Sequence, residues 1–178
     1  MGLKYTMAGV DIDESRKPGE SPDAMVLRLA QEKALAADPA IELPVLGSDT
    51  VVVLGDTVFG KPHSGEDAQS MLGQLSGRRH RVLTAVAIRY KSDLLTAVSQ
   101  TFVQCRDITP DEAQQYWHTG EPVGKAGAYA IQGLGGVFVS GIDGSYSGVM
   151  GLPVFETAEL LRQVGIQIPD NALTNEDE

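Results

Sequence analysis

The sequence predicts a single α/β domain built around a twisted mixed sheet. Helix-type and strand-type patterns alternate along the chain, and two pairs of strand-type segments are joined by short turns, as in antiparallel hairpins. The 178 residues are enough for one well-buried domain and too few for two of ordinary size. We expect this domain to span residues 1–168, with a polar, acidic tail at 169–178.

The helices are predicted from their start signals. Ser21-Pro22-Asp23 combines a capping hydroxyl, a proline at the first helical position and an acid in the first turn. Two further segments carry similar helix-start signals. They are Ser64 with Asp67 three residues later, and Thr109-Pro110 before an acidic pair. The predicted helices are, in order, 22–37, 64–75, 109–120 and 153–164.

The strands are predicted from β-branched runs and from alternation of apolar and polar residues. Gly55-Asp56 and Ser92-Asp93 are the turns of the two hairpins, and a glycine-rich stretch at 124–151 is expected to carry short strands. The other predicted strands are 3–10, 45–54, 57–59, 81–90 and 94–108.

The charge balance argues against a nucleic-acid-binding protein. The chain has 24 acidic and 14 basic side chains and a net charge of −10, whereas binding a phosphate backbone requires a basic face. The short cluster Arg78–Arg81 is the strongest basic feature, so we disfavour binding of RNA or DNA. An anionic ligand would have to be held in a pocket by a few lysines and a divalent cation.

Cysteine content and hydropathy point to the cytoplasm. The single cysteine, Cys105, permits neither a disulfide framework nor a thiolate zinc site, and in an apolar strand we interpret it as buried filler more readily than as a nucleophile. No apolar run approaches the ~20 residues of a spanning helix. The N-terminus lacks the basic-then-apolar pattern of a secretory signal.

Asp49 is a charged residue within a segment that is otherwise predicted to be a buried strand. It interrupts the apolar run 45–54, where a carboxylate must be neutralised, hydrogen-bonded or bound to metal. An acid at a strand bulge that caps neighbouring backbone groups is the structural alternative. The flanking glycine and serine favour a functional role, because they let a ligand approach closely.

Two lysines and a second acid complete a candidate phosphate site. Lys33 falls within the apolar stripe of its predicted helix, where a lysine extending its amine to solvent is an equally good interpretation. Lys61 follows the first hairpin, and Glu14 ends an acidic turn. Lysine serves as a point charge for phosphate, and Mg²⁺ usually takes one or two carboxylates plus phosphate oxygens.

Taken in order, these residues lie in segments that resemble the Maf-like nucleotide pyrophosphatases, from Leu3 to Leu161. The run Lys125–Gly133 is the most specific of them. Gln132–Gly136 and the Asp49-Thr50 pair look like the dTTP/UTP branch of the family rather than the 7-methyl-GTP branch. The matching segments are Asp11–Glu14, Arg28–Ala34, Gly47–Val52, Lys61-Pro62, Leu75–Val82, Gly120–Pro122, Lys125–Gly133, Gly144–Tyr146 and Gly151–Pro153.

The resemblance implies an elongated sheet flanked by helices, with two lobes and a central cleft, in a homodimer. It implies hydrolysis of the bond between the α- and β-phosphates of dTTP or UTP, and of modified pyrimidine nucleotides, with Mg²⁺ or Mn²⁺. By the same resemblance, Asp49 is the general base. Asp49 and Glu14 hold the cation, Lys33 and Lys61 bind phosphates, and Thr50 and Gln132 discriminate the base. A carboxylate in a dry cleft, with its pKa raised, suits such chemistry.

The sequence departs from the family at its start. Family members begin with a strand, a loop of the form Ser-x-Ser-Pro-Arg-Arg and a helix, whereas Met1-Gly2 aligns near the end of that helix. A chain beginning at Met1 is therefore expected to lack a phosphate-binding loop, to be poorly stable and to turn over slowly or not at all. The alternatives left open are a catalytically impaired nucleotide-binding or regulatory protein and 7-methyl-GTP specificity.

Overall fold

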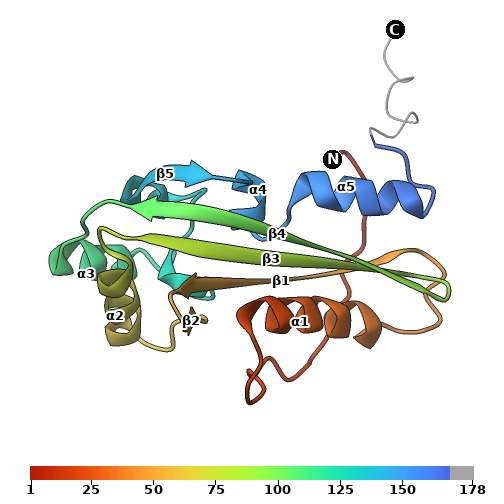
Figure 1. Cartoon of the computed structure of the whole chain (residues 1–178), viewed down its shortest axis with the longest axis horizontal. Helices are drawn as coiled ribbons and strands as arrows, with labels where there is room; N and C mark the ends of the chain where they lie inside the picture. The colour runs from red at the N-terminus through yellow and green to blue at the C-terminus, as the bar shows by residue number, and fades with distance from the viewer. Residues whose placement is uncertain (169–178) are drawn as a thin grey trace, which may run out of the picture.

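A twisted antiparallel sheet forms the long axis of the molecule (Figure 1). The computed structural model describes residues 1–168, so the acidic tail expected at 169–178 lies outside the described residues. Within the described part of the chain the strand order is β2-β1-β3-β4-β5. The strands are β1 (Val45–Leu54), β2 (Thr57–Phe59), β3 (Arg79–Tyr90), β4 (Asp93–Cys105) and β5 (Val139–Asp143).

The helices follow the predicted capping signals. The side chains of Ser21, Ser64 and Thr109 each accept a backbone hydrogen bond at the start of a helix, and Thr109 forms a reciprocal capping box with Glu112. The helical elements are α1 (Pro22–Ala36), α2 (Gly65–Leu75), α3 (Pro110–His118), η1 (Ala126–Ala128), η2 (Leu134–Phe138), α4 (Tyr146–Val149) and α5 (Val154–Gln163).

The α/β class is confirmed, with two differences in detail. Every strand pairing among residues 1–168 is antiparallel, whereas we expected a mixed sheet. The glycine-rich stretch 124–151 folds mainly into the short helices η1, η2 and α4 and contributes one strand, β5. Its glycines make tight turns: Gly124 and Gly127, for example, have φ values of +75° and +70°.

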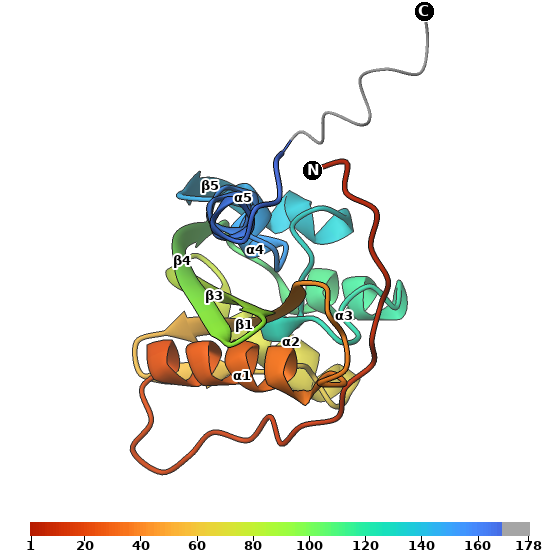
Figure 2. The same ribbon diagram turned by 90° about the vertical axis from the view of Figure 1, so that its right-hand side faces the viewer.

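The predicted strand at 3–10 is wrong. Residues 1–17 contain neither helix nor strand, and the segment passes along one side of the sheet from α5 to the start of α1 (Figure 2). A strand needs a partner for its backbone groups, and alternation of apolar residues alone does not supply one. Leu3 packs against the apolar cluster of α5 and Ile12 against that of α1, while Tyr5 and Met7 are exposed.

The two faces of the sheet are covered differently. Figure 2 shows α1 on one side of β1 and β3, and α4 and α5 on the other. On the α1 face a continuous apolar cluster includes Val51, Val53 and Leu83. The opposite face carries two separate apolar clusters, one with α2 and α3 and one with α5.

A row of hydroxyl side chains, which we call the polar belt, crosses the sheet between these two clusters. Along β3 the order is Val82 in one cluster, Thr84 in the belt and Val86 in the other cluster. Thr50 on β1 and Ser99 on β4 are the direct register partners of Thr84. The belt consists of Ser48, Thr50, Thr84, Ser99 and Thr101, and α4 lies on it.

Candidate active site

A pocket of ≈ 250 Å³ lies along the outer edge of β1. Because β2 pairs only with Val52–Leu54, no strand among residues 1–168 covers the outer edge of the rest of β1. Side chains from both faces of β1 therefore reach the pocket. Its lining includes five of the six residues singled out from the sequence, namely Lys33, Asp49, Thr50, Lys61 and Gln132.

Asp49 lies on the α1 face of β1 with only 10% of its side chain exposed. Its Oδ1 is 2.6 Å from the Nζ of Lys33. Burial raises the pKa of Asp49 above its ordinary value of 3.8, because the loss of hydration outweighs the favourable charge of Lys33. Asp49 is thus a carboxylate with increased basicity in a half-dry pocket, and it does not cap backbone groups at a bulge.

Lys33 bridges two carboxylates. Its Nζ is 2.6 Å from Asp49 and 2.7 Å from Oε1 of Glu14, and 20% of its side chain is exposed. Burial opposes its positive charge, but the two carboxylates more than compensate and raise the pKa of Lys33 above 10.5. Lys33 therefore remains an ammonium group at neutral pH and does not simply extend into solvent.

Glu14 lies at the rim of the pocket and contacts both predicted lysines. Its Oε2 accepts a hydrogen bond of 2.9 Å from Lys61 Nζ, and its Oε1 pairs with Lys33. These two lysines lower the pKa of Glu14. Among the six residues, Glu14 is the one absent from the pocket lining itself.

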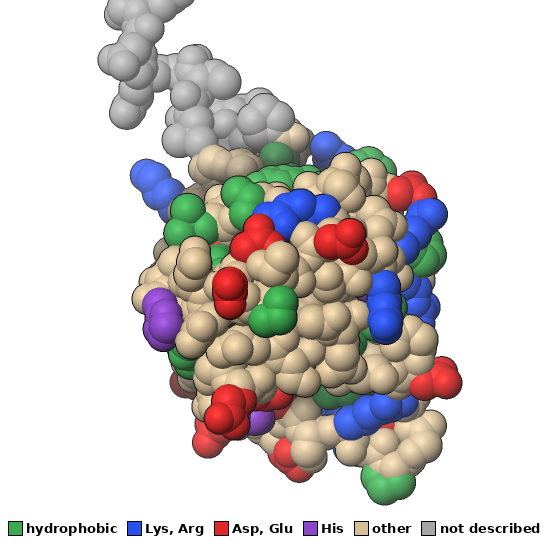
Figure 3. Space-filling model, turned by 90° about the vertical axis from the view of Figure 1, so that its left-hand side faces the viewer, with side chains coloured by type: hydrophobic (Ala, Val, Ile, Leu, Met, Phe, Trp, Pro, Cys, Tyr) green, Lys and Arg blue, Asp and Glu red, His purple; other side chains and the backbone are tan. Residues whose placement is uncertain are grey.

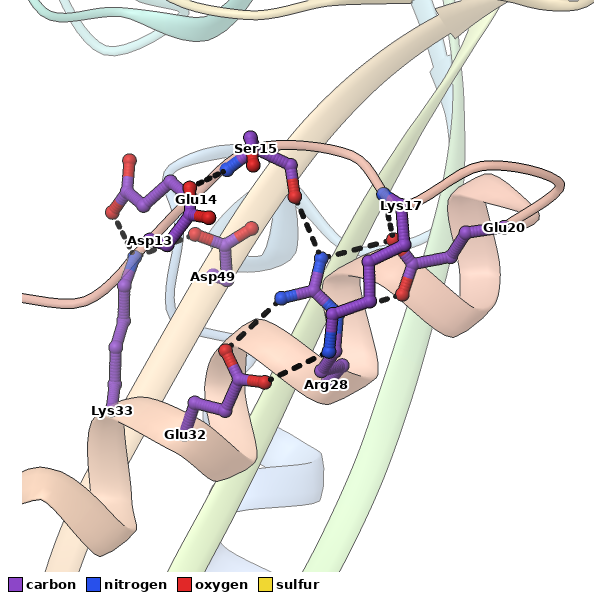
Figure 4. A network of polar contacts seen from close by, with 9 residues as sticks. All are labelled: Asp13, Glu14, Ser15, Lys17, Glu20, Arg28, Glu32, Lys33 and Asp49. Carbon is purple, nitrogen blue, oxygen red and sulfur yellow. Dashed lines mark hydrogen bonds and ion pairs between the residues drawn. The ribbon is translucent and has the colours of Figure 1, made fainter.

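The segment that carries Glu14 is anchored to α1 by Arg28 (Figure 4). The guanidinium donates to both carboxylate oxygens of Glu20, at 2.7 and 2.9 Å, and to the carbonyl of Ser15 at 3.0 Å. It also pairs with Glu32 one turn further along the helix. This network holds an otherwise irregular segment in place, which is why a residue from a loop can meet residues of β1 and α1.

The donor set fits a divalent cation that takes most of its ligands from elsewhere. Within residues 1–168 no group of three or more His, Cys, Asp and Glu side chains is arranged to hold a metal ion. Asp49 and Glu14 are nevertheless brought together on a single amine. One or two carboxylates are the usual protein ligands of a Mg²⁺ ion whose other ligands are phosphate oxygens and water.

Lys125 also lines the pocket, although we expected no role for it from the sequence. It lies in the pocket lining with Lys61, and each of these lysines follows a glycine. The amide of Gly127 donates to the carbonyl of Gly60 at 3.0 Å, which holds the two Gly-Lys turns together. The repeated Gly-Lys pair is the one feature of the sequence that could have indicated a role for Lys125. The backbone contact between the two distant turns is what places both lysines in the same pocket.

Thr50 and Gln132 line the pocket from different elements. Thr50 lies on the polar-belt face of β1, opposite to Asp49. Gln132 lies in the loop between η1 and η2, which Glu121 organises by accepting hydrogen bonds of 2.9 Å from the amides of Leu134 and Gly135. The pocket thus has a charged side toward α1 and an uncharged polar side toward α4.

The other sequence candidates do not line this pocket. Burial raises the pKa of Cys105 to about 11, and the thiol packs in the core cluster of α2 and α3. Within Arg78–Arg81, His80 is buried, Arg79 pairs with Asp143 and Arg81 contacts Gln100. On the end of the molecule that carries α2 and α3, basic and acidic side chains are interspersed (Figure 3).

None of the described helices is both long and apolar enough to cross a bilayer.

Comparison with known proteins identifies the family of this chain. The dTTP/UTP pyrophosphatase of Bordetella avium is 52% identical over 95% of this chain and 89% of its own length. Those of Pseudoalteromonas atlantica and Saccharophagus degradans are 46% and 47% identical, over 93% and 96% of this chain and 89% and 84% of their own lengths. A family model described as Maf-like protein matches residues 1–164, and the chain therefore belongs to the Maf-like family.

Proposed function

We propose that this protein is a nucleoside triphosphate pyrophosphatase that hydrolyses dTTP and UTP to the monophosphate and pyrophosphate. The observation that carries the proposal is the buried carboxylate of Asp49 beside Lys33 in a pocket of suitable size. The names of the relatives, dTTP/UTP pyrophosphatase, supply the reaction and the nucleotides.

The division of the pocket suggests how a nucleotide would lie in it. Lys33, Lys61 and Lys125 provide positive charge for the phosphates. Thr50 and Gln132, on the uncharged side, would face the base; the amide of Gln132 offers both a donor and an acceptor. The triphosphate would then pass Asp49.

Asp49 would act as the general base. With its pKa raised by burial, it accepts a proton from water more readily than an exposed aspartate does. The water oxygen forms a bond to the α-phosphorus as the bond from that phosphorus to the bridging oxygen breaks, and pyrophosphate leaves. Lys33 and Lys61 would stabilise the negative charge that develops on the phosphates.

A divalent cation belongs to this proposal. Asp49 and Glu14 are the residues that would hold it. When bound, Mg²⁺ or Mn²⁺ neutralises the phosphates and orients them. Since one ammonium group lies between the two carboxylates, Lys33 would have to release at least one of them for the cation to bind.

The test is pyrophosphate release from dTTP and UTP, with Mg²⁺ and with EDTA, by the wild type and Asp49→Asn. We expect Asp49→Asn to lose at least about 10²-fold in kcat with nucleotide binding retained. The matched control is Asp56→Asn, in the exposed hairpin turn after β1, which should behave as wild type. Binding without turnover in the wild type would favour the nucleotide-binding alternative, and a preference for 7-methyl-GTP would contradict the substrate assignment.

Two further proposals rest on the family resemblance, a homodimer and a cytoplasmic location. Light scattering coupled to size-exclusion chromatography would distinguish a monomer of 18.9 kDa from a species of twice that mass. Fractionation of cells that express the native protein would test its location.

A further inference from the structure

A buried threonine outside the pocket lies directly behind one of its lining residues. Thr84 is fully buried in the polar belt, and its Oγ1 is 2.9 Å from Oγ1 of Thr50 and 2.7 Å from the carbonyl oxygen of Gly148. Thr84 does not line the pocket, whereas Thr50 does. Thr84 therefore connects the pocket wall to the short helix α4.

The direction of these hydrogen bonds follows from counting protons. A carbonyl oxygen can only accept, so the single hydroxyl proton of Thr84 is donated to Gly148. In the contact between the two threonines, Thr84 must then accept and Thr50 must donate. With its only proton committed, Thr50 offers a ligand lone pairs and no donor.

Ser48, two residues away on the same face of β1, has the same property. Its Oγ lies 2.9 Å from the carbonyl of Ala85 and 2.8 Å from the carbonyl of Gly151, so its proton is also directed into the protein. Ser48 lines the pocket as well. The hydroxyl-bearing side of the pocket is thus an accepting surface, although it is built from groups that could in principle donate.

We infer that the Gly148–Thr84–Thr50 relay selects pyrimidine bases that present an N–H donor at ring position N3. This inference rests on the proposed function and specifies its substrate class. Uracil and thymine carry a proton on N3, whereas N3 of cytosine is an acceptor and would face the lone pairs of Thr50. When the wrong ligand leaves a buried polar atom of the site without a hydrogen-bond partner, the site discriminates strongly against that ligand. Thr84 is then a positioning residue, since it acts through Thr50.

The experiment measures equilibrium binding of non-hydrolysable α,β-methylene analogues of UTP and CTP, so that no turnover is needed. We expect wild type to bind the UTP analogue at least about tenfold more tightly than the CTP analogue. In Thr84→Val the proton of Thr50 is free to turn toward the ligand, and the preference should fall by about tenfold. Thr84→Ser, which keeps the hydroxyl, should retain the wild-type ratio.

The control for a merely structural effect is Thr101→Val. Thr101 is another buried belt threonine; its Oγ1 donates to the carbonyl of Ser145 and accepts from the amide of the same residue, just before α4. Its loss should loosen α4 without changing the proton of Thr50. Unfolding curves for each variant would show that the fold is retained.

Three results would overturn the inference. They are equal binding of the two analogues by wild type, binding of neither, and an equal loss of preference in Thr84→Val and Thr101→Val. Failure of the proposed function looks different: it is absence of pyrophosphate release from UTP and dTTP by a wild type that still binds the UTP analogue preferentially.

Discussion

Lys33 and Asp49 show how single residues can be stable in a half-buried charged site. Each is expensive to bury alone, and their pairing, with Glu14 as a third partner, reduces that cost. The pairing does not cancel the cost for Asp49, whose pKa remains raised. A site of this kind sacrifices some stability for a reactive carboxylate.

Removing the bridging amine should change the pH dependence of catalysis. Lys33 lowers the pKa of Asp49, so in Lys33→Met the acid limb of the kcat/KM profile should move to higher pH, and kcat/KM at pH 7 should fall by about 10²-fold. Pyrophosphate release measured from pH 5 to 9 would show both effects. Lys61→Met is the control: its side chain is 58% exposed and acts on Asp49 only at longer range, so its shift should be smaller. An acid limb unchanged in Lys33→Met would argue against Asp49 as the base.

His80 should make the folded protein sensitive to mild acid. Burial lowers its pKa from 6.5 to about 4, and its side chain contacts Tyr129 through Nε2 while Nδ1 has no partner. The unfolded chain therefore binds a proton between these pH values when the folded chain does not. The contribution of the neutral His80 ring to the free energy of unfolding is therefore fully present above pH 6.5, and it is lost as the pH falls toward 4.

We expect the free energy of unfolding to decrease by about 2 kcal/mol between pH 7.5 and pH 5. Urea unfolding at the two pH values would measure it. His80→Gln, which has no titrating ring, should remove most of this difference. A wild type equally stable at both pH values would show that His80 is not held neutral.

At the scale of elements, the close contact between α1 and β1 determines where Lys33 lies. Gly47 of β1 faces the helix: a Cβ at this position would meet the backbone carbonyl of Ala30 and lie 2.6 Å from the amide nitrogen of Ala34. Contacts this close to backbone atoms cannot be relieved by a change of rotamer. The glycine therefore allows the helix to approach closely enough for Lys33 to reach Asp49.

Gly47→Ala should force α1 away from β1. We expect a loss of about 1–3 kcal/mol in the free energy of unfolding, together with reduced kcat, because the Lys33–Asp49 contact is displaced. Gly73→Ala, on the exposed face of α2 with no atom within 4 Å of the new Cβ, should instead stabilise by about 0.5–1 kcal/mol. Urea unfolding and steady-state kinetics on both variants give the comparison; unchanged kinetics in Gly47→Ala would argue against the importance of this contact.

At the scale of the whole molecule, the net charge of −10 opposes an anionic substrate. Close to the pocket the opposing charges nearly balance, since Asp49 and Glu14 offset two of the three lysines. Long-range repulsion by the remaining surface is then the main electrostatic effect on a nucleotide approaching from solvent. Salt screens this repulsion more effectively than it screens half-buried pairs.

The KM for dTTP should therefore decrease as NaCl is raised from about 10 to about 100 mM, over which range the Debye length shortens from ~30 to ~10 Å. Steady-state kinetics at fixed Mg²⁺ and pH would measure it. Potassium glutamate at the same ionic strength is the control for a specific effect of chloride. A KM that rises steadily with salt would show that local attraction by the lysines dominates.

Much of this organisation could be predicted from short-range patterns. The capping hydroxyls of Ser21, Ser64 and Thr109 marked the helix starts correctly, because a cap is a local interaction between neighbours in sequence. Asp49 could be identified as a pocket residue because it is a charged residue in an apolar strand. A buried carboxylate requires a partner in any fold, so this signal also depends on the local sequence alone.

Long-range contacts supplied the rest. The alternation at 3–10 resembled a strand, but residues 3–10 pair with no strand of the described chain, and the pairing partner of a segment is a property of the folded chain. Lys125 joined the pocket through the contact of two distant glycine turns, and Thr84 gained its significance from the register of β1 with β3 and from α4 above it. Local sequence specified which side chains need partners; the packing of distant segments specified which partners they found, because hydrogen bonds and ion pairs depend on positions in space and not on spacing along the chain.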